Sequence, residues 1–456
     1  RLPMQMNDPA QPTVGFVSLG CAKNLVDSQI MAGALVRRGL SLAPSTEEAD
    51  VIIVNTCAFI EEARAESLEH IHAVCRLKSA GSCRAVIVAG CLSQRYRQRL
   101  RTELPEVDAF IGLDEIDRVD EFVRRAARGE HGLVEVSPAA GRIFEPPVPG
   151  LVFSGGVHAY VKIAEGCNHR CAFCAIPAIR GRRRSRAPAN ILAEARALLD
   201  NGFKELDLIA QDTTSYGRDM KDVAGPAGLV RRLAELPGRF WIRLLYSYPS
   251  RITDELLEAL GSVPNLCRYL DVPVQHSHPE MLKAMRRGNT ADAVRRLAGR
   301  VRAAVPGITL RTTCLVGFPG EREEHFRRLL DYVREARFDH LGCFVFSPED
   351  GTPACDLPDR PPREVAEERC RALLAAQMEI VAQKAGALLG DTADALLERR
   401  HEDVWVARTE RQAPESDGCT YIVDAPGDWR PGTFVPIRYT DHDEYDMVAE
   451  PFDDER

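Results

Sequence analysis

The sequence lacks any apolar run of the roughly 18 residues that a membrane-spanning helix needs, so nothing in it predicts a membrane protein. The first twelve residues, RLPMQMNDPAQP, also lack the pattern of a secretory signal and are expected to form a loose leader. Without an export signal, 14 cysteines favour a reducing compartment, where clustered thiols more often bind metal than form disulfides. We therefore expect a cytoplasmic protein that has no membrane partner.

Most of the chain also lacks a large net charge, because its basic and acidic residues are nearly equal in number. Residues 1–390 contain 52 Lys and Arg against 49 Asp and Glu, a balance of +3, whereas residues 391–456 contain 7 against 18, a balance of −11. The negative charge is thus concentrated in the tail. A length of 456 residues, 45% of them hydrophobic and 28% charged, is typical of a globular protein with roughly two to four domains.

Apolar, β-branched runs alternate with helical patterns in the first part of the chain. The runs lie at 14–20, 50–56, 84–90 and 109–113, and helical patterns separate them. This alternation predicts a parallel α/β sheet covered on both faces, in a domain over residues 12–128. Cys21, Cys57 and Cys91 follow the first three strands, at the edge where such sheets bind ligands. Three thiols at one topological position favour a shared site over three separate buried side chains.

The middle of the chain repeats a strand and helix pattern. Strand candidates lie at 159–166, 205–212, 241–249, 268–275, 309–317 and 340–348. These six β/α units are fewer than the roughly eight of a closed barrel, so we expect an open barrel over residues 153–385. The basic run RGRRRSR (180–186) follows the first strand, and its pattern alone indicates a solvated surface.

Three cysteines lie just after the first of these strands, at the rim where barrel enzymes keep their chemistry. Cys167, Cys171 and Cys174 are spaced Cys-x3-Cys-x2-Cys. Three thiolates suit an iron–sulfur cluster, whereas a structural zinc site needs four ligands and would have to add one such as His169. The spacing is far more specific than a lone Cys-x2-Cys pair, but it leaves the zinc alternative open.

The spacing of this trio resembles the signature of the radical S-adenosylmethionine (SAM) superfamily. The resemblance implies that Cys167, Cys171 and Cys174 hold a [4Fe–4S] cluster whose free iron binds SAM and whose electron cleaves SAM to a radical. The layout of the whole chain is similar to that of the methylthiotransferases of this superfamily. In them a first cysteine trio binds a second [4Fe–4S] cluster, which carries the sulfur to be inserted. The resemblance gives this auxiliary role to Cys21, Cys57 and Cys91.

Other barrel segments also resemble the family. LIAQDTTSYG (208–217), DVPVQH (271–276) and VGFPGE (316–321) each end a strand. The resemblance implies SAM contacts by Gln211, Asp212, Gln275 and His276, the last two facing the cleft. The remaining eight cysteines match no ligand motif and are expected to be ordinary thiols: Cys75, Cys83, Cys267, Cys314, Cys343, Cys355, Cys370 and Cys419.

The tail changes character after a helical pattern at about 363–388. Short strands at 404–410, 420–425 and 433–441, separated by Gly, Pro and Asp, predict a small all-β barrel over residues 388–454. Its position resembles that of the TRAM domain, which helps the tRNA-modifying methylthiotransferases to grip RNA. A balance of −11 in this segment would repel RNA and attract a basic protein, so we do not expect RNA contact to dominate.

The substrate implied by the resemblance is a protein. SLGCAKNLVDS (18–28) and CFVFSPEDGT (343–352) are similar to the branch that methylthiolates the β-carbon of an aspartate in small-subunit ribosomal protein twelve, a strongly basic protein. The family also implies an electron donor such as flavodoxin or ferredoxin. The alternatives are a tRNA adenosine methylthiotransferase, a non-catalytic protein with two clusters, and a zinc protein.

Overall fold

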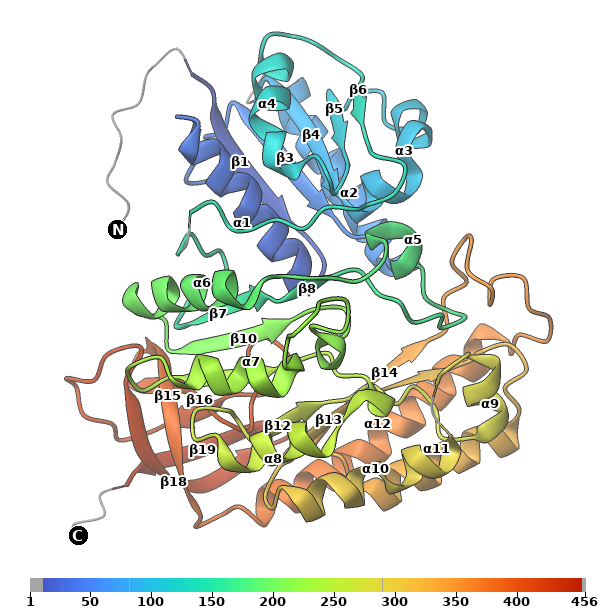
Figure 1. Cartoon of the computed structure of the whole chain (residues 1–456), viewed down its shortest axis with the longest axis vertical. Coiled ribbons are helices and arrows are strands. Elements are labelled where there is room, and N and C mark those ends of the chain that lie inside the picture. Colours follow the sequence, from blue (N-terminus) through green and yellow to red (C-terminus); the bar gives the residue numbers. More distant parts are fainter. Residues whose placement is uncertain (1–10, 82, 149, 289, 453–456) are drawn as a thin grey trace.

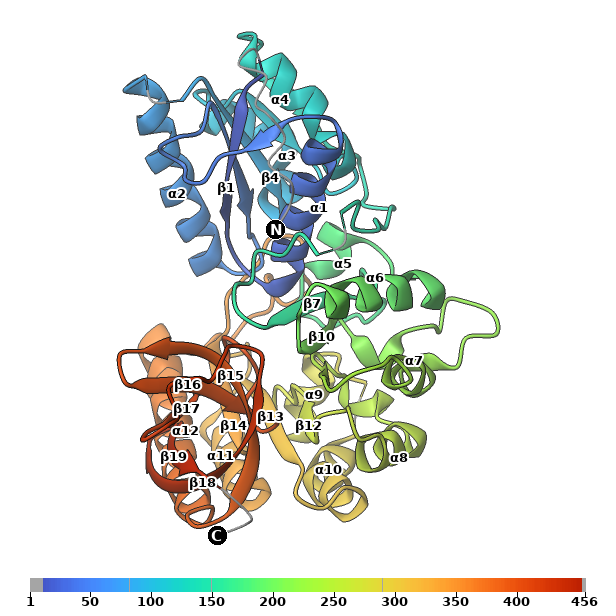
Figure 2. The ribbon, with the colours of Figure 1, turned by 90° about the vertical axis from the view of Figure 1, so that its left-hand side faces the viewer.

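The computed structural model describes residues 11–81, 83–148, 150–288 and 290–452. An N-terminal sheet domain stands above an open barrel, and a small closed β-barrel lies against the opposite end of that barrel (Figure 1, Figure 2). The predicted fold class is confirmed by this arrangement. Among the described helices, none is long and apolar enough to cross a membrane.

The N-terminal domain is a six-stranded parallel sheet in the order β2-β1-β3-β4-β5-β6. Its central strands β3 and β4, VIIVNT and AVIVAG, are buried along their whole length because helices cover both faces. Alternate side chains of these strands pack against α1 and α4 on one face and against α2 and α3 on the other. The elements are β1 (Thr13–Ser18), α1 (Ala22–Arg37), β2 (Ser41–Leu42), β3 (Val51–Thr56), α2 (Glu61–Ser79), β4 (Ala85–Gly90), α3 (Cys91–Glu103), β5 (Ala109–Ile111), η1 (Ile116–Arg118), α4 (Val119–Ala127) and β6 (Leu133–Glu135).

The sequence pattern does not reveal the two edge strands of this sheet. Strand β2 has 2 residues and β6 has 3, and neither has a fully buried side chain. Strand β6 pairs with β5 although it begins at Leu133, so the sheet extends past residue 128, the predicted end of the domain. Short, half-exposed edge strands lack the apolar periodicity on which a sequence prediction depends.

The middle domain is an open barrel of six parallel strands, β7 and β10 to β14, at the predicted positions. Their hydrogen bonds form two three-stranded sheets, β11-β10-β7 and β12-β13-β14, which one bridge between Ile242 and Leu266 connects. The strands are β7 (His158–Lys162), β8 (Ala164–Glu165), β9 (Arg184–Ser185), β10 (Glu205–Ile209), β11 (Trp241–Leu244), β12 (Tyr269–Asp271), β13 (Thr309–Val316) and β14 (His340–Val345). The helices are α5 (Ile176–Arg180), α6 (Pro188–Asp200), η2 (Thr213–Ser215), α7 (Gly225–Ala234), η3 (Pro249–Arg251), α8 (Asp254–Ser262), α9 (Pro279–Ala284), α10 (Ala291–Ala304), α11 (Glu323–Ala336) and α12 (Arg363–Gly386).

The C-terminal domain is a closed barrel of five strands in the order β15-β16-β17-β19-β18. Strands β16, β17 and β18 lie where the sequence predicts them, whereas β15 and β19 are not among the predicted strands. The charged residues at the end of β15 (LERRH) hide the alternation of apolar and polar residues along this strand. Leu397 of β15 and Trp405 of β16 nevertheless belong to one hydrophobic core. The strands are β15 (Thr392–His401), β16 (Val404–Thr409), β17 (Thr420–Ile422), β18 (Phe434–Asp443) and β19 (Asp446–Pro451).

This small barrel covers the N-terminal ends of the middle-domain strands. Arg408 of β16 lies 2.6 Å from Glu205, the first residue of β10. Asp417 accepts hydrogen bonds from Tyr269 of β12 and from Arg311 of β13. Part of the acidic balance of the tail is therefore neutralised by cations of the middle domain.

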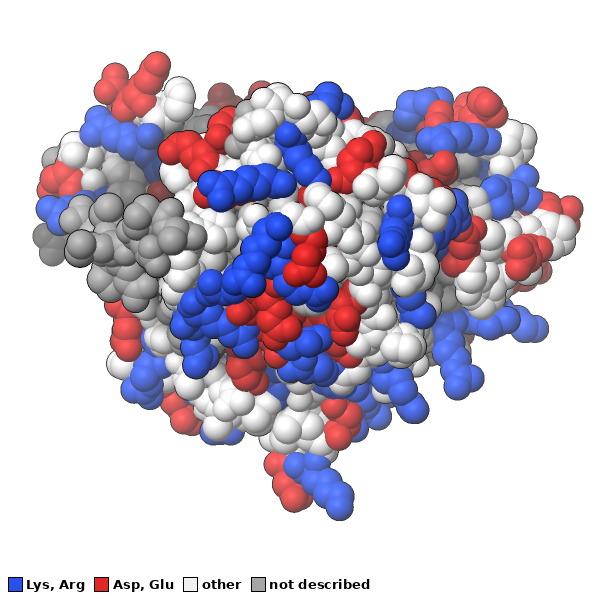
Figure 3. Space-filling view, turned by 90° about the horizontal axis from the view of Figure 1, so that it is seen from above, with Lys and Arg blue, Asp and Glu red and all other residues white. Residues whose placement is uncertain are grey.

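The face of the N-terminal domain that points away from the barrel carries both charge signs. Seen from above, basic side chains alternate with acidic ones over this face (Figure 3). A polyanion binds most strongly to a surface of one positive sign. This face therefore gives no support to an RNA-binding role.

Candidate active site between two domains

Three parallel strands of the N-terminal sheet are each followed by a cysteine. Cys21 precedes α1, Cys57 follows β3 and Cys91 is the first residue of α3. Because β1, β3 and β4 are neighbours that run in the same direction, their carboxyl ends meet at one edge of the sheet. The structure thus brings the three sequence-predicted thiols together, with Cys57 and Cys91 buried and Cys21 exposed.

Two glycines allow the backbone to pass close to this trio. Gly20 has φ +86°, and a Cβ atom there would lie 2.7 Å from Cβ of Cys57. Gly90 has φ +92°, and a Cβ atom there would lie 2.2 Å from Oδ1 of Asn55. Both positions need glycine, because of the positive φ and because no side chain fits.

The thiols of the first trio interact with one another and with one cation. Burial raises the pKa of Cys91 to about 12, Arg180 opposes this shift, and Cys57 and Cys21 add to it. Nη2 of Arg180 donates a hydrogen bond to Sγ of Cys91 at 3.3 Å. Neutral thiols are poor ligands, but iron deprotonates the thiols that it binds, and a neighbouring cation stabilises the thiolate. Three converging thiols beside a buried arginine are therefore a donor set that fits an iron–sulfur cluster.

The second trio lies on the loop after β8. The backbone N–H of Cys167 donates to the carbonyl of Gly181, and that of Cys174 donates to the carbonyl of Cys171, so the loop folds back on itself. Burial raises the pKa of Cys167 to about 11 and that of Cys174 to about 12, and Cys171 adds to both shifts. Arg287 lies beside this trio and donates to Sγ of Cys171 at 3.5 Å. This second set of three thiols with a cation fits a cluster for the same reasons.

His169 is the example of a fourth zinc ligand that the sequence offers, but its ring is held elsewhere. The imidazole stacks on Tyr248 with ring centroids 3.6 Å apart, and its Nε2 lies 2.6 Å from Oδ2 of Asp212. Thr214 and Ser215 donate to the same carboxylate at 2.5 Å. His169 therefore fastens the cysteine loop to the barrel rim, which argues against the zinc alternative.

A closed network of buried charges joins the two trios. Lys162 at the end of β7 lies 2.5 Å from Asp27 of α1 and 2.6 Å from Glu165. Arg180 at the end of α5 lies 2.9 Å from each of the same two carboxylates. Burial opposes ionisation, yet Arg180 and Lys162 together hold the pKa of Glu165 well below its ordinary range. Because Arg180 also donates to Cys91, one side chain connects the first trio to the segment that follows the second.

We expect Asp27→Asn to lower the free energy of unfolding by about 3–5 kcal/mol, because it leaves an uncompensated positive charge in a buried network. Urea denaturation of the purified chain measures this difference. Asp254→Asn is the matched control, since Asp254 pairs with Arg300 on the surface and its side chain is 94% exposed. The control should leave stability nearly unchanged, and equal losses in both variants would contradict the importance of the network.

Two of the sequence-predicted SAM contacts lie after β10. Gln211 is partly exposed, its Nε2 donates to Glu165 at 2.8 Å, and its Oε1 has no hydrogen-bond partner among the described residues. Asp212 is engaged with His169. Gln211 thus has one buried acceptor without a partner among the described residues, whereas Asp212 supports the cysteine loop.

The other two predicted contacts follow β12. Gln275 is partly exposed and adopts a positive φ of +70°. His276 is predicted to face the cleft, but the structure buries its side chain completely. Its Nε2 lies 3.6 Å from Oε1 of Glu321, and its Nδ1 accepts the backbone N–H groups of Ser277 and His278. We therefore assign His276 to packing between β12 and α11.

The sequence analysis missed the buried charges that join the trios. It interpreted RGRRRSR as a solvated surface, and this is wrong for two members, because Arg180 and Arg186 are 1% and 2% exposed. The carboxylates that neutralise Arg180 are Glu165 of β8, 15 residues away in sequence, and Asp27 of α1, 153 residues away. The dense basic run directly after a cysteine trio is the one feature of the sequence that points to these buried charges. Only the fold shows which carboxylates pair with the arginines.

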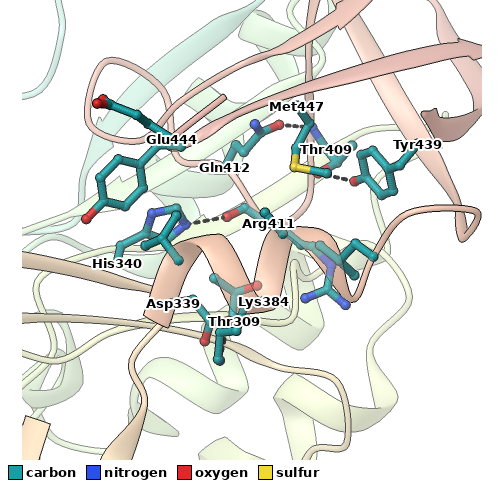
Figure 4. A pocket seen from close by; sticks show the side chains of 14 residues that line it. Thr309, Asp339, His340, Lys384, Thr409, Arg411, Gln412, Tyr439, Glu444 and Met447 are labelled. Carbon is teal, nitrogen blue, oxygen red and sulfur yellow. Dashed lines mark hydrogen bonds and ion pairs between the residues drawn. The ribbon is translucent and has the colours of Figure 1, made fainter. Parts of the chain in front are cut away.

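A well-defined pocket lies at the other end of the barrel (Figure 4). It is formed where the starts of β13 and β14 and the helix α12 meet the C-terminal barrel. His340 bonds to the carbonyl of Arg411 at 3.1 Å, and this contact docks the C-terminal domain. Lys384 of α12 pairs with Asp339 at 2.6 Å within the middle domain. Both cysteine trios follow the carboxyl ends of strands, and this pocket is therefore separate from the candidate active site.

Comparison with family models divides the chain into three parts. Residues 13–112 match the model described as uncharacterized protein family UPF0004, residues 161–333 match the radical SAM superfamily, and residues 389–451 match the TRAM domain. The second cysteine trio lies inside the radical SAM match and the first inside the UPF0004 match.

Solved structures of low sequence identity share the fold. The radical S-adenosylmethionine methyltransferase TsrM from Kitasatospora setae aligns with a TM-score of 0.56 at 16% identity, over 76% of this chain and 77% of that chain. The cobalamin-dependent S-adenosylmethionine radical enzyme OxsB aligns with a TM-score of 0.52 at 14% identity, over 82% of this chain and 56% of that chain. The fold and the cysteine spacing together define a radical SAM protein, a class whose cofactors are SAM and a [4Fe–4S] cluster.

Relatives of much higher sequence identity show which family within this class the chain belongs to. A protein of Trichlorobacter lovleyi is 44% identical over 98% of this chain and 99% of its own length, and one of Desulforudis audaxviator is 44% identical over 96% of each. A protein of Geobacter sulfurreducens is 42% identical over 97% of this chain. All three are named ribosomal protein uS12 methylthiotransferase RimO. The chain belongs to the RimO family.

Proposed function

We propose that this chain inserts a methylthio group at the β-carbon of an aspartate in ribosomal protein uS12, using SAM and two [4Fe–4S] clusters. The observation that carries this proposal is the pair of cysteine trios on facing domains, each with three thiols and a cation, joined by Arg180. The name shared by the three relatives supports the same activity and does not favour the alternative of a tRNA adenosine methylthiotransferase.

The two trios have different tasks in this proposal. Cys167, Cys171 and Cys174 would hold the cluster that supplies the electron for SAM cleavage, and Cys21, Cys57 and Cys91 would hold the cluster that supplies the sulfur. The buried charge network of α1, β7, β8 and α5 would hold the two domains, and with them the two sites, in a fixed relation. Gln211, whose buried Oε1 has no hydrogen-bond partner among the described residues, and the partly exposed Gln275 would help to orient SAM.

The remaining partners follow from the chemistry. A reduced cluster requires an electron donor, which we propose is a flavodoxin or a ferredoxin. The cytoplasm fits a protein whose working thiols must stay reduced, and the 14 cysteines are all free thiols.

Anaerobic reconstitution tests the proposed function. The enzyme should bind about eight irons, two [4Fe–4S] clusters, and should transfer a methylthio group to purified uS12 but not to tRNA. Mass spectrometry of both substrates measures the transfer. A product on tRNA alone would favour the alternative activity, and zinc without iron would rule out both.

The acidic tail is expected to steer the basic substrate. Asp441, Asp443 and Glu444, at the turn between β18 and β19, are exposed. Asp446 is excluded from this surface, because it is half-buried and accepts the backbone N–H of Cys419 at 2.7 Å, and Asp453, Asp454 and Glu455 lie outside the described residues. The turn lies at the end of the barrel away from the cysteine trios, so it acts by long-range attraction and does not hold the target aspartate.

Changing Asp441 and Asp443 to Asn and Glu444 to Gln should slow association with uS12 at low salt by about tenfold, because steering depends on local charge. Stopped-flow measurements at low and high salt should also show a flatter salt dependence, since screening acts over ~8 Å at physiological ionic strength. The control removes three exposed charges from the N-terminal domain, at Glu66, Glu69 and Glu106. Equal slowing in both variants, or tight binding of tRNA by the wild type, would rule out recruitment by this turn.

A further inference from the structure

One buried cation beside the first trio is not paired with a carboxylate by any hydrogen bond or salt bridge among the described residues. Lys23 is the second residue of α1, two positions after Cys21, and is only 5% exposed. Its ammonium lies 2.7 Å from the ring centroid of Tyr246. Within the described part of the chain, no salt bridge and no hydrogen bond engages this ammonium. The neighbouring cations Lys162 and Arg180 contrast with it, because each is bound to two carboxylates.

The nearby carboxylates are already engaged by other groups. Glu165 binds Lys162, Arg180 and Gln211. Oδ2 of Asp271 accepts the backbone N–H of Tyr246 at 2.9 Å. A buried ammonium without an acceptor is costly, because the ring face of a tyrosine does not replace three hydrogen bonds. The described residues therefore give the Lys23 ammonium no hydrogen-bond acceptor, and an anion beside it would supply one.

The residue that meets Lys23 from the barrel is held in an unusual conformation. Tyr246, just after β11, has a φ of +63°, which is rare for a bulky side chain. Its N–H donates to Asp271 and its carbonyl accepts the backbone N–H of Thr213, and these bonds maintain the conformation. Strain of this kind is concentrated at ligand sites. It turns a barrel residue toward α1, so that both domains line the space around Lys23.

We propose that Lys23 binds the side-chain carboxylate of the substrate aspartate. The inference rests on the proposed function and deepens it. An aspartate carboxylate supplies the anion that Lys23 lacks, and a charge-assisted hydrogen bond between them is strong in a buried site. Because Lys23 is two residues from Cys21, a carboxylate held there places the adjacent β-carbon at the side of the first trio. The positive charge of Lys23 thereby selects an aspartate side chain over an asparagine side chain and over an uncharged nucleobase.

The test compares two substrates with the reconstituted full-length enzyme. One is uS12, and the other is uS12 in which the target aspartate is replaced by asparagine. Lys23→Met should lower kcat/KM for the natural substrate roughly 10- to 100-fold, the range of a hydrogen bond between charged groups, and should reduce the preference for aspartate over asparagine by a similar factor. Lys23→Arg keeps the charge and should retain most of this preference, and Lys221→Met removes an exposed lysine as a control.

Two further readouts separate substrate binding from loss of structure. Iron content and SAM cleavage without substrate should be the same in Lys23→Met as in the wild type. If the wild type modifies uS12 and Lys23→Met keeps its full preference for aspartate, the role of Lys23 is wrong and the proposed function stands. A Lys23→Met variant that loses iron, together with a Lys23→Arg variant that loses the preference, also overturns the role. A wild type that never modifies uS12 overturns the proposed function and this inference with it.

Discussion

Replacing Cys167, Cys171 and Cys174 together by alanine is expected to abolish reductive cleavage of SAM. All three lie on one loop at the barrel rim, where Cys171 raises the pKa of both other thiols and Arg287 donates to Cys171. Without them, no trio of cysteines remains among the described residues of the radical SAM match. The variant should retain about four irons of about eight, and it should form no 5′-deoxyadenosine above background with dithionite.

The matched control replaces three partly exposed free thiols that belong to neither trio: Cys355, Cys370 and Cys419. Cys167 and Cys174 are similarly exposed, whereas Cys171 is buried. Their triple alanine variant should keep all of its iron and its SAM cleavage. Formation of 5′-deoxyadenosine by the variant of Cys167, Cys171 and Cys174 would show that the radical SAM cluster is bound elsewhere.

The second large effect concerns the other trio. Cys21, Cys57 and Cys91 changed to alanine should leave SAM cleavage intact and remove the methylthio product completely. The physical reason is that the two sites lie on different domains. These thiols belong to the N-terminal sheet, and Arg180 connects Cys91 to the barrel side. The measurement is 5′-deoxyadenosine by chromatography and modified uS12 by mass spectrometry, in the same reaction.

Single alanine variants test the ligand role of each cysteine separately. Cys91 is buried and bonded to Arg180, whereas Cys21 is exposed, so the two replacements disturb the protein differently. A shared loss of product in all three single variants would indicate a common ligand role. Normal product from any one of them would remove that residue from the ligand set.

Periodicity explains which parts of the fold could be predicted. Strands β3 and β4 are continuous apolar runs because both of their faces are covered, and the six barrel strands carry similar runs. Strands β2 and β6 are short and half-exposed, and β15 ends in charged residues, so none of the three has a pattern to detect. Prediction succeeded where the apolar pattern along a strand is clear, and it failed where strands are short or where charged residues hide the pattern.

The cysteines of the site could be predicted, whereas the charges around them could not. Topology places Cys21, Cys57 and Cys91 at one edge from the strand pattern alone. The same reasoning gives no information on Arg180, whose burial depends on Asp27 from another domain. Lys23 likewise looks like any helix-surface lysine in the sequence, and only the packing of α1 against Tyr246 shows that it is buried.

The central claim is that both trios act together on one aspartate of uS12. The most direct measurement is mass spectrometry of uS12 and of total tRNA from a strain in which this gene is deleted and then restored. We expect uS12 to lose exactly one methylthio group on deletion and to regain it with the wild-type gene but not with the Cys21, Cys57 and Cys91 variant, while tRNA stays unchanged. Unaltered uS12 in the deletion strain, or loss of methylthio groups from tRNA instead, would contradict the account.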